Sequence, residues 1–313
     1  MIPSKPQFVG QKVRLGDVVK IEKAPTPSGN NVWMLNLDAV EKDTGRVIIK
    51  NRVEADSVGI STIAFTAKAV LYSKLRPNLN KVVVADEPGL ATSEMLPLIT
   101  NPKILDRRYL AYLLRSSSFV NLAVSSTAGS KMPRVNKKTL LNAVFSIPNL
   151  ESQHQRVNQL SAIEEARTKA ELTIVQLDSF VKSRFVEMFG TLDSNPFSLP
   201  VKKMGEVAEQ LIAGGDKPTD ITVQKDKNHV YPVYANGVID GGIQGYSSKA
   251  RVNKPAVTIA ARGTIGFCCI RDAGFTPVVR LISMVPDSSL DLTYLKYYID
   301  SLNLAGSGTS QAQ

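Results

Sequence analysis

The chain has 313 residues, of which 43% are hydrophobic and 21% are charged, and its formal net charge is +10. This composition is near the globular average, so it argues against a largely disordered chain and allows two domains with their own cores. No run approaches the roughly 18 apolar residues of a membrane-spanning helix, and the N-terminus lacks the apolar region of a signal peptide. The only cysteines are the neighbours Cys268 and Cys269, which predicts reduced packing residues in a cytoplasmic protein.

The positive charge is concentrated in the first half of the chain. Residues 1–150 contain 21 Lys and Arg against 11 Asp and Glu, whereas residues 191–313 contain 12 against 11. A basic first half indicates a polyanionic partner, most simply nucleic acid. Charge alone leaves open the alternative that the excess only keeps the protein soluble.

The first half reads as a series of strands followed by a helix. Segment 105–124 is amphipathic and predicts one helix. Residues 129–148 then lead through a basic turn into a further strand. A polar and basic loop with a proline is expected over residues 72–81. Apolar alternation and β-branched runs predict strands within 12–21, 32–40, 45–53, 59–75, 81–85 and 89–99.

The longest predicted element is a helix from about Leu150 to Phe189. The stretch lacks Gly and Pro, Pro148 precedes it, Gly190 follows it, and Asn149 can cap it. Positions three and four residues apart in alternation are mostly apolar, as in a coiled coil. About 40 residues at 1.5 Å each make a helix of roughly 60 Å. The apolar positions of this seam are Leu160, Ile163, Ala170, Ile174, Leu177, Val181 and Met188.

Two interpretations of the seam are open. The seam could pack on the flanking domains, as amphipathic helices usually do. The length of the helix and its neutral flanks favour pairing with a second long helix instead.

After the helix the earlier pattern returns. Residues 204–207 (MGEV) resemble residues 15–18 (LGDV), and segment 290–301 resembles 105–116, which aligns Tyr109 with Tyr294. Segment 274–282 occupies the same position in the second copy as segment 89–99 does in the first. Such repetition predicts a duplicated module. We therefore expect an α+β chain in which two similar mixed α/β domains, 1–149 and 191–313, are separated by a coiled-coil-type helix at 150–190. Nothing repeats residues 133–189, so the second domain is expected to be incomplete.

Motifs of the common enzyme classes are missing. The two histidines, His154 and His229, lie far from the cysteines, so a zinc site is not expected. The chain contains no dinucleotide fingerprint, phosphate-binding loop or nucleophile elbow. An amino-methyltransferase motif and a nuclease carboxylate core are also absent. The sequence therefore predicts a binding protein with no catalytic residue, metal or cofactor of its own.

Loop residues supply the candidate DNA contacts. Lys and Arg neutralise phosphates, while Asn, Gln, Arg, Ser and Thr read base edges. Loop 72–81 offers both kinds, and the basic turn near residue 134 offers mainly phosphate contacts. Each candidate could instead be an ordinary solvated loop residue. The candidates are Lys74, Arg76, Asn78, Asn80, Lys81, Lys131, Arg134, Lys137, Lys138, Asn236, Gln244, Tyr246, Lys249, Arg251, Arg262 and Thr264.

Together these segments resemble the specificity subunit of type I restriction-modification systems. The resemblance is carried by the two tetrads, by AVLYSKLRPNLNKV and GLATSEMLPL in the first copy, and by VYPVYANGVIDG and ARGTIG in the second. The helices YLAYLL and YLKYYI and the segment FSIPNLESQHQRVNQL before the long helix also carry it. It covers nearly the whole chain, and its specificity comes from the order and repetition of the segments.

The resemblance implies a non-catalytic subunit whose two target-recognition domains each read half of a split DNA sequence. In that family, two antiparallel long helices set the spacing, and the subunit docks adenine methyltransferase (M) subunits, which bind S-adenosylmethionine. Restriction (R) subunits join to complete the complex. This sequence has one long helix, so we expect its seam to pair with a second copy in a twofold dimer. Whether Gln313 is a natural end stays open.

Two other classes of function compete with this interpretation. One is a DNA-modifying or DNA-cleaving enzyme with an unrecognised site. The other is a coiled-coil adaptor without a DNA role, which the basic first half argues against. The salt dependence of binding distinguishes the adaptor from a DNA-binding protein, because phosphate contacts weaken steeply as ionic strength rises.

Overall fold

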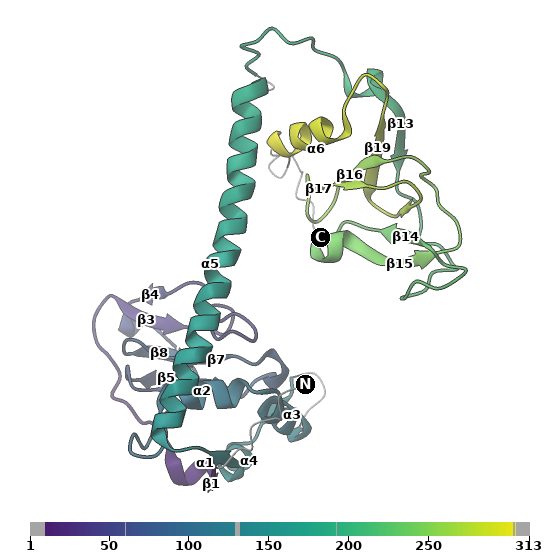
Figure 1. Cartoon of the computed structure of the whole chain (residues 1–313). Coiled ribbons are helices and arrows are strands. Elements are labelled where there is room, and N and C mark those ends of the chain that lie inside the picture. Colours follow the sequence, from purple (N-terminus) through teal and green to yellow (C-terminus); the bar gives the residue numbers. More distant parts are fainter. Residues whose placement is uncertain (1–9, 60, 129–131, 192, 303, 305–313) are drawn as a thin grey trace. The chain divides into compact units, whose positions relative to one another are not determined.

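The computed structural model describes residues 10–59, 61–128, 132–191, 193–302 and 304 (Figure 1). It divides into two compact units, Met1–Thr168 and Lys169–Gln313, which we call the N-terminal and C-terminal units. The helix α5 (Leu150–Phe189) belongs to both, since the division falls within it.

The N-terminal unit is built on two four-stranded sheets. The first is antiparallel throughout, in the order β2-β9-β6-β7, and the second has the order β4-β3-β8-β5 with β3 and β8 parallel. Two further pairs are β1 with β12 and β10 with β11. The strand bounds are β1 Gln11–Arg14, β2 Val19–Ile21, β3 Val32–Leu35, β4 Asn51–Val53, β5 Thr62–Phe65, β6 Val70–Ser73, β7 Val82–Val84, β8 Gly89–Thr92, β9 Met95–Thr100, β10 Thr127–Ala128, β11 Arg134–Val135 and β12 Val144–Ile147.

Short helices connect these strands. The segment predicted as one helix over 105–124 is two helices, because Ser116 has an extended backbone and its hydroxyl caps the second one by accepting from Phe119 N–H. The stretch 89–99 is likewise two strands, β8 and β9, separated by a turn. The helices are α1 Leu15–Val18, α2 Arg107–Arg115, α3 Ser117–Ser125 and α4 Lys137–Asn142, with 3₁₀ turns η1 Ala55–Ser57 and η2 Pro77–Leu79.

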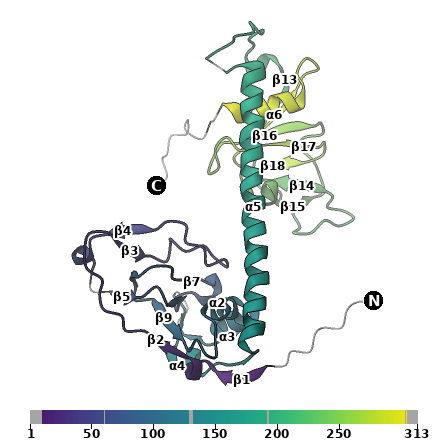
Figure 2. The same ribbon diagram turned by 60° about the vertical axis from the view of Figure 1, so that its left-hand side comes forward.

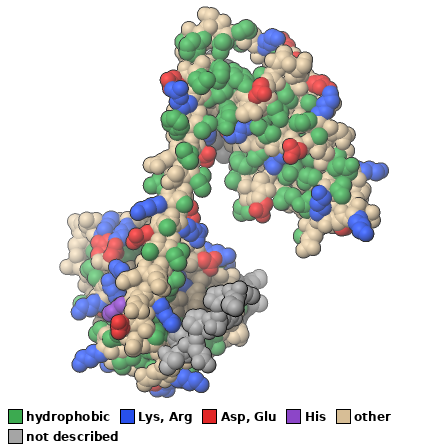
Figure 3. Space-filling view, in the orientation of Figure 1, with side chains coloured by type: hydrophobic (Ala, Val, Ile, Leu, Met, Phe, Trp, Pro, Cys, Tyr) green, Lys and Arg blue, Asp and Glu red, His purple; other side chains and the backbone are tan. Residues whose placement is uncertain are grey.

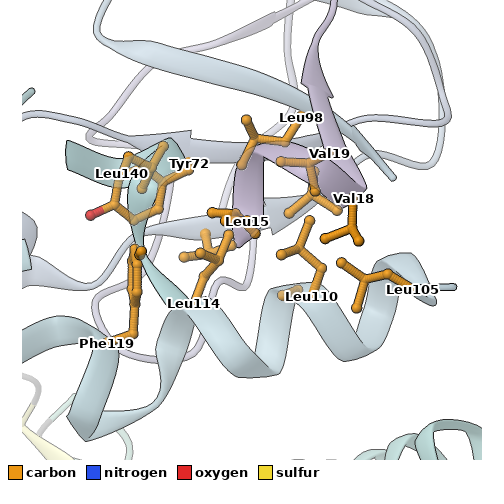
Figure 4. Close-up of a cluster of buried hydrophobic side chains, with 14 of the residues drawn as sticks. Leu15, Val18, Val19, Tyr72, Leu98, Leu105, Leu110, Leu114, Phe119 and Leu140 are labelled. Atoms are coloured by element: carbon orange, nitrogen blue, oxygen red, sulfur yellow. The ribbon is translucent and has the colours of Figure 1, made fainter. Parts of the chain in front are cut away.

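The core of this unit lies where α2 and α3 pack against the first sheet. Leu110 and Leu114 of α2 are fully buried beside Leu15, Leu98 and Phe119 (Figure 4). These positions lie one helical turn apart on α2, so one apolar face of the helix meets the sheet. A second cluster surrounds the buried Trp33 in the other sheet.

The C-terminal unit repeats this arrangement. One sheet is antiparallel in the order β13-β19-β16-β17, and the other has the order β15-β14-β18 with β14 and β18 parallel. The strand bounds are β13 Ala208–Ala213, β14 Tyr231–Tyr234, β15 Ile243–Ser247, β16 Ala256–Ala260, β17 Cys268–Arg271, β18 Thr276–Pro277 and β19 Leu281–Pro286. The remaining elements are η3 Met204–Glu206, η4 Ile239–Gly242 and α6 Leu292–Ser301.

The two units therefore share one framework. The order β2-β9-β6-β7 corresponds to β13-β19-β16-β17, and the parallel pair β3–β8 corresponds to β14–β18. The helices α2 and α6 begin at equivalent caps, since Asp106 accepts from Tyr109 N–H and Asp291 accepts from Tyr294 N–H. These features confirm the predicted fold class of two similar α/β domains with a long helix between them in the sequence.

The long helix has the predicted bounds, and it is one unbroken coil in Figure 2. Asn149 accepts the N–H of Ser152 at 3.0 Å, which caps its start. Gly190 ends it with φ +79°, a conformation that favours glycine. Among the described residues, no helix is both long enough and apolar enough to cross a membrane.

Candidate nucleic-acid interface

Two predicted basic loops of the N-terminal unit lie side by side. The N–H of Arg76 donates to the carbonyl of Pro133 at 2.8 Å, and the N–H of Val135 donates to the carbonyl of Lys74 at 3.1 Å. Leu75 forms a β-bridge with Arg134. Segments 74–76 and 133–135 are far apart in the sequence, so the fold joins them. We call this pair of segments the basic platform.

The side chains of the platform differ in exposure. Lys74 is half-buried, and this burial lowers the pKa of its ammonium group. Arg76 is exposed with φ +49°, and its guanidinium makes no hydrogen bond or ion pair within the described part of the chain. Asn78 is exposed on the turn η2 that follows. Arg76 and Asn78 are therefore the exposed polar side chains of this loop.

Arg134 is paired with an acidic residue that the sequence did not single out. Its Nη2 lies 2.9 Å from Oε1 of Glu94, and its Nε donates to the same oxygen at 3.0 Å. This hydrogen bond raises the pKa of the guanidinium further above neutrality. Glu94 lies in the turn between β8 and β9, and only the fold brings it to residue 134.

Asn80 and Lys81 have partners inside the protein. Asn80 is 8% exposed, and its amide donates to the carbonyl of Arg115 at 3.1 Å and to Asp43 Oδ1 at 3.3 Å. The ammonium group of Lys81 donates to the carbonyl of Leu37 at 2.6 Å. These bonds secure loop 72–81 to its surroundings, so neither side chain is presented as the free donor that the sequence suggested.

Two further candidates of this unit, Lys137 and Lys138, lie at the start of α4. Lys137 and Lys138 are both exposed. Asn136 caps the helix by accepting the N–H of Lys138 at 2.8 Å. Lys131 lies outside the described residues. The helix therefore holds two ammonium groups beside the platform, and residue 137 is close enough to lower the pKa of Lys74 slightly by repulsion.

In the C-terminal unit the structure brings two predicted residues together. The hydroxyl of Thr264 donates to the carbonyl of Asn236 at 2.9 Å. The side-chain oxygen of Asn236 is buried and has no hydrogen-bond partner among the described residues. Arg262, two residues before Thr264, is exposed. These three residues lie on neighbouring loops.

The other candidates of this unit lie on or after β15. Gln244 is exposed and Tyr246 is half-buried on the strand itself. Lys249 and Arg251 follow it and are exposed. The guanidinium of Arg251 lies directly over Gly215, so a Cβ at residue 215 would require the guanidinium to shift.

Sequence reasoning missed Arg271, which lies on β17. Its guanidinium stacks 3.8 Å from the ring centroid of Tyr234, and its Nε donates to the hydroxyl of Thr258 at 3.1 Å. It also donates to the carbonyl of Gly241 in η4. Arg271 thus fixes the loop after Asn236. No local pattern distinguishes this arginine from other strand residues.

The apolar seam of α5 is exposed. Ile163 and Ile174 are 64% and 60% exposed, and Leu172, Val175 and Phe180 outside the seam are exposed as well. Apolar side chains are visible along the helix in Figure 3. The predicted seam residues Leu160, Ile163, Ala170, Ile174, Leu177, Val181 and Met188 are all exposed.

Carboxylate, thiol and imidazole groups meet at most in pairs, such as Cys268 with Asp300 and His229 with Asp226, within the described ranges. No set of three His, Cys, Asp or Glu in the described ranges could hold a metal ion. What the loops do offer is ammonium, guanidinium and amide groups, which suit phosphates and base edges.

The chain matches the family model for the type I restriction modification DNA specificity domain at residues 10–176 and 199–311. It is 28% identical over 215 residues to a Mycoplasma pneumoniae protein described as type I specificity subunit S.MpnORF507P, covering 67% of this chain and 57% of that protein. It is 27% identical over 159 residues to the Escherichia coli type I restriction enzyme EcoDI specificity subunit, covering 50% of this chain and 35% of that protein. The chain thus spans just over half of the length of the first relative and about a third of the length of the second.

Solved structures share the fold. The S subunit of a type I restriction-modification system from M. genitalium matches 95% of this chain and 78% of its own, with TM-score 0.56 and 14% identity. A structure from work on complex assembly and conformational transition of the type I R-M system matches 97% of this chain and 82% of its own, with TM-score 0.55 and 21% identity. Since the two matched segments each contain one of the repeated α/β sheet pairs, the chain belongs to the family of type I restriction-modification DNA specificity domains.

Proposed function

We propose that this chain is the non-catalytic DNA-recognition subunit of a type I restriction-modification complex and that it reads a bipartite DNA target. The observation that carries the proposal is the repeated framework, which falls within the two segments that match the specificity family. Each copy presents its own set of exposed polar loop residues. In this proposal, residues 1–149 and 191–313 are the recognition domains and residues 150–190 are the spacer.

The candidate residues divide into two roles. Arg76 and Asn78 in the first domain, and Asn236, Gln244, Arg262 and Thr264 in the second, carry groups that can read base edges. Lys74, Lys137, Lys138, Lys249 and Arg251 carry charges that suit phosphates. Tyr246, between Gln244 and Lys249 in the sequence, would supply a further contact to the DNA. The basic excess of residues 1–150, 21 against 11, supports stronger phosphate contact by the first domain.

The proposed partners follow from this role. Adenine-N6 methyltransferase subunits would bind S-adenosylmethionine and act at the site that this chain selects. Restriction subunits would add cleavage. This chain would contribute no catalytic residue.

We further propose that the exposed seam of α5 pairs with the seam of a second copy. Apolar side chains at 3.5-residue spacing are typical of helices that pair with another helix, and Ile163, Ile174 and Leu177 are 64%, 60% and 56% exposed. A twofold axis across the helices would give both copies the same contacts, and the two copies of the first recognition domain would then read the two halves of an interrupted palindrome.

The seam has a matched control. Ile174→Glu should abolish the dimer in sedimentation at micromolar concentration. Leu172→Glu, two residues away and thus on another face, is similarly exposed at 57% and should leave the dimer intact. A wild-type protein that sediments only as a monomer would contradict the pairing.

The function is tested by co-expressing the chain with a cognate methyltransferase subunit and mapping N6-methyladenine in the host genome. Methylation only when both proteins are present, and only at a split motif, is the expected result. Methylation or cleavage by this chain alone would favour the enzyme alternative. A salt-independent assembly that never binds DNA would favour the coiled-coil adaptor.

A further inference from the structure

Arg134 and Glu94 form a braced pair at the edge of the basic platform. Both Nε and Nη2 of the arginine contact one carboxylate oxygen, Oε1, at 3.0 and 2.9 Å. The arginine side chain is 48% exposed, whereas that of the glutamate is 24% exposed. Glu94 therefore occupies one edge of the guanidinium from the protein side.

The opposite end of the guanidinium remains available. The other contact of this guanidinium in the described part of the chain, from Nη1 to the carbonyl of Met132, is long at 3.5 Å. The end formed by Nη1 and Nη2 is planar and carries parallel donors, which fit O6 and N7 of guanine in the major groove. A phosphate contact does not need a fixed guanidinium plane, since the ammonium group of lysine serves as well.

The pair rests on backbone that is bonded across three segments. The N–H of Lys74 donates to the carbonyl of Glu94 at 2.9 Å, and the N–H of Val135 donates to the carbonyl of Lys74 at 3.1 Å. The second carboxylate oxygen of Glu94, Oε2, is buried and has no hydrogen-bond partner among the described residues. Oε1 is thus the oxygen turned toward Arg134. A side chain held in this way presents its donors in one direction.

Resting on the DNA-recognition function proposed above, we infer that Arg134 determines specificity by reading a guanine. Glu94 is the positioning residue that sets the plane of the guanidinium. This role differs from the phosphate contact that the sequence suggested for Arg134. It also accounts for the acidic side chain of Glu94 beside the basic platform. If the platform only attracted DNA by its charge, a carboxylate at this place would weaken the attraction.

The test uses the full-length chain and a library of randomised duplex DNA. After selection, binding of the enriched duplex and of its single-base variants is measured at several salt concentrations. Arg134→Lys should lose preference for guanine at one position by roughly 5- to 150-fold, with an unchanged salt slope. Glu94→Ala should relax the same position although the arginine is present. Glu94→Gln, which keeps an acceptor oxygen, should retain part of the preference.

A second arginine provides the control. Arg14 donates through Nε and Nη2 to one oxygen of Asp17 at 3.1 and 2.6 Å, the same pattern at another place in the unit. Asp17→Asn changes the net charge as Glu94→Gln does. It should leave the base preference unchanged at every position.

Three results would overturn the inference. If Arg134→Lys keeps the guanine preference, the planar group is not the reader. If Arg134→Ala weakens all sequences equally and lowers the salt slope by about one, the residue contacts phosphate. In both cases DNA recognition itself stands. If the wild-type chain enriches no sequence, the proposed function fails and this inference fails with it. Thermal unfolding of each variant confirms that it is folded.

Discussion

The two units use one strand order with different chemistry around it. Tyr109 and Tyr294 occupy equivalent positions on α2 and α6. Tyr109 belongs to the buried core of the N-terminal unit, whereas Tyr294 is partly exposed and packs edge-on against Phe189 of α5 at 5.0 Å. The framework therefore tolerates a change in what the helix contacts. Its loops differ even more, since the first unit carries nearly all of the excess positive charge.

The same contrast appears where α5 joins each unit. In the N-terminal unit Gln153 is fully buried and makes three hydrogen bonds. In the C-terminal unit Phe185 is buried among aromatic rings, 5.2 Å from Tyr294 and 6.3 Å from Tyr297. The first attachment combines these directional hydrogen bonds with the burial of Val157, whereas the second consists of packed aromatic rings. This difference can be tested at both ends of the helix.

The largest effect is expected at the aromatic attachment. Phe185→Ala should lower the unfolding free energy of the C-terminal unit by about 3–5 kcal/mol, because it removes a buried ring and leaves a cavity. The measurement is denaturant unfolding followed by circular dichroism. Phe180→Ala is the control, since Phe180 is 61% exposed and its loss should have little effect on unfolding. Equal effects of the two substitutions would contradict the packing described here.

The polar attachment should be nearly as sensitive. Gln153→Ala removes the acceptor of Asp106 N–H and the donor to the carbonyls of Ile104 and Pro148. Leaving these buried groups unpaired should cost about 2–4 kcal/mol. The fluorescence of Trp33, the only tryptophan, reports unfolding of this unit. Gln155→Ala, two residues further along the helix at an exposed position, should change stability by less than about 0.5 kcal/mol.

The caps of the equivalent helices should differ by a smaller amount. Asp106 accepts from the N–H groups of Arg108 and Tyr109, whereas Asp291 accepts from Tyr294 N–H. Asp106→Ala should therefore cost about 1–2 kcal/mol and Asp291→Ala about 0.5–1 kcal/mol. Thermal unfolding of both variants checks the order. A larger loss for Asp291→Ala than for Asp106→Ala would contradict the predicted order.

The smallest effect concerns DNA affinity and depends on the proposed function. Lys137→Ala and Lys138→Ala should each reduce the slope of log affinity against log salt by about one, without changing base preference. The matched control is Lys103→Ala, which removes an exposed charge from the turn before α2. An unchanged slope in the α4 variants would remove these lysines from the phosphate contacts.

The two ends of the long helix are predictable from local sequence signals. Pro148, Asn149 and Gly190 act within a few residues of the helix ends, and the structure confirms the bounds. The break at Ser116 was missed, although a run of three serines is a suitable capping signal. The stretch 89–99 is predicted as one strand interrupted by small residues, whereas the structure places a turn at residues 93–94 between two strands.

The site was less accessible to sequence reasoning, because its contacts are non-local. Asn80 and Lys81 looked like free donors until the fold placed Arg115 and Leu37 against them. Glu94 looked like an ordinary surface acid, yet it lies 40 positions from its partner Arg134 in the sequence. Polar loop residues could therefore be nominated from their type. Which of them are free depends on the tertiary structure.

The alternation of β17 has a practical consequence for watching the two units separately. Burial, together with the hydrogen bond to Asp300, raises the pKa of the Cys268 thiol. Cys269, on the other face of the strand, is half-buried. Thiol alkylation of the native protein should thus favour Cys269, and a second label should enter only when this sheet opens. Both cysteines are in the C-terminal unit. The rate at which the mass of the protein rises by a second alkyl group therefore measures the opening of that unit alone.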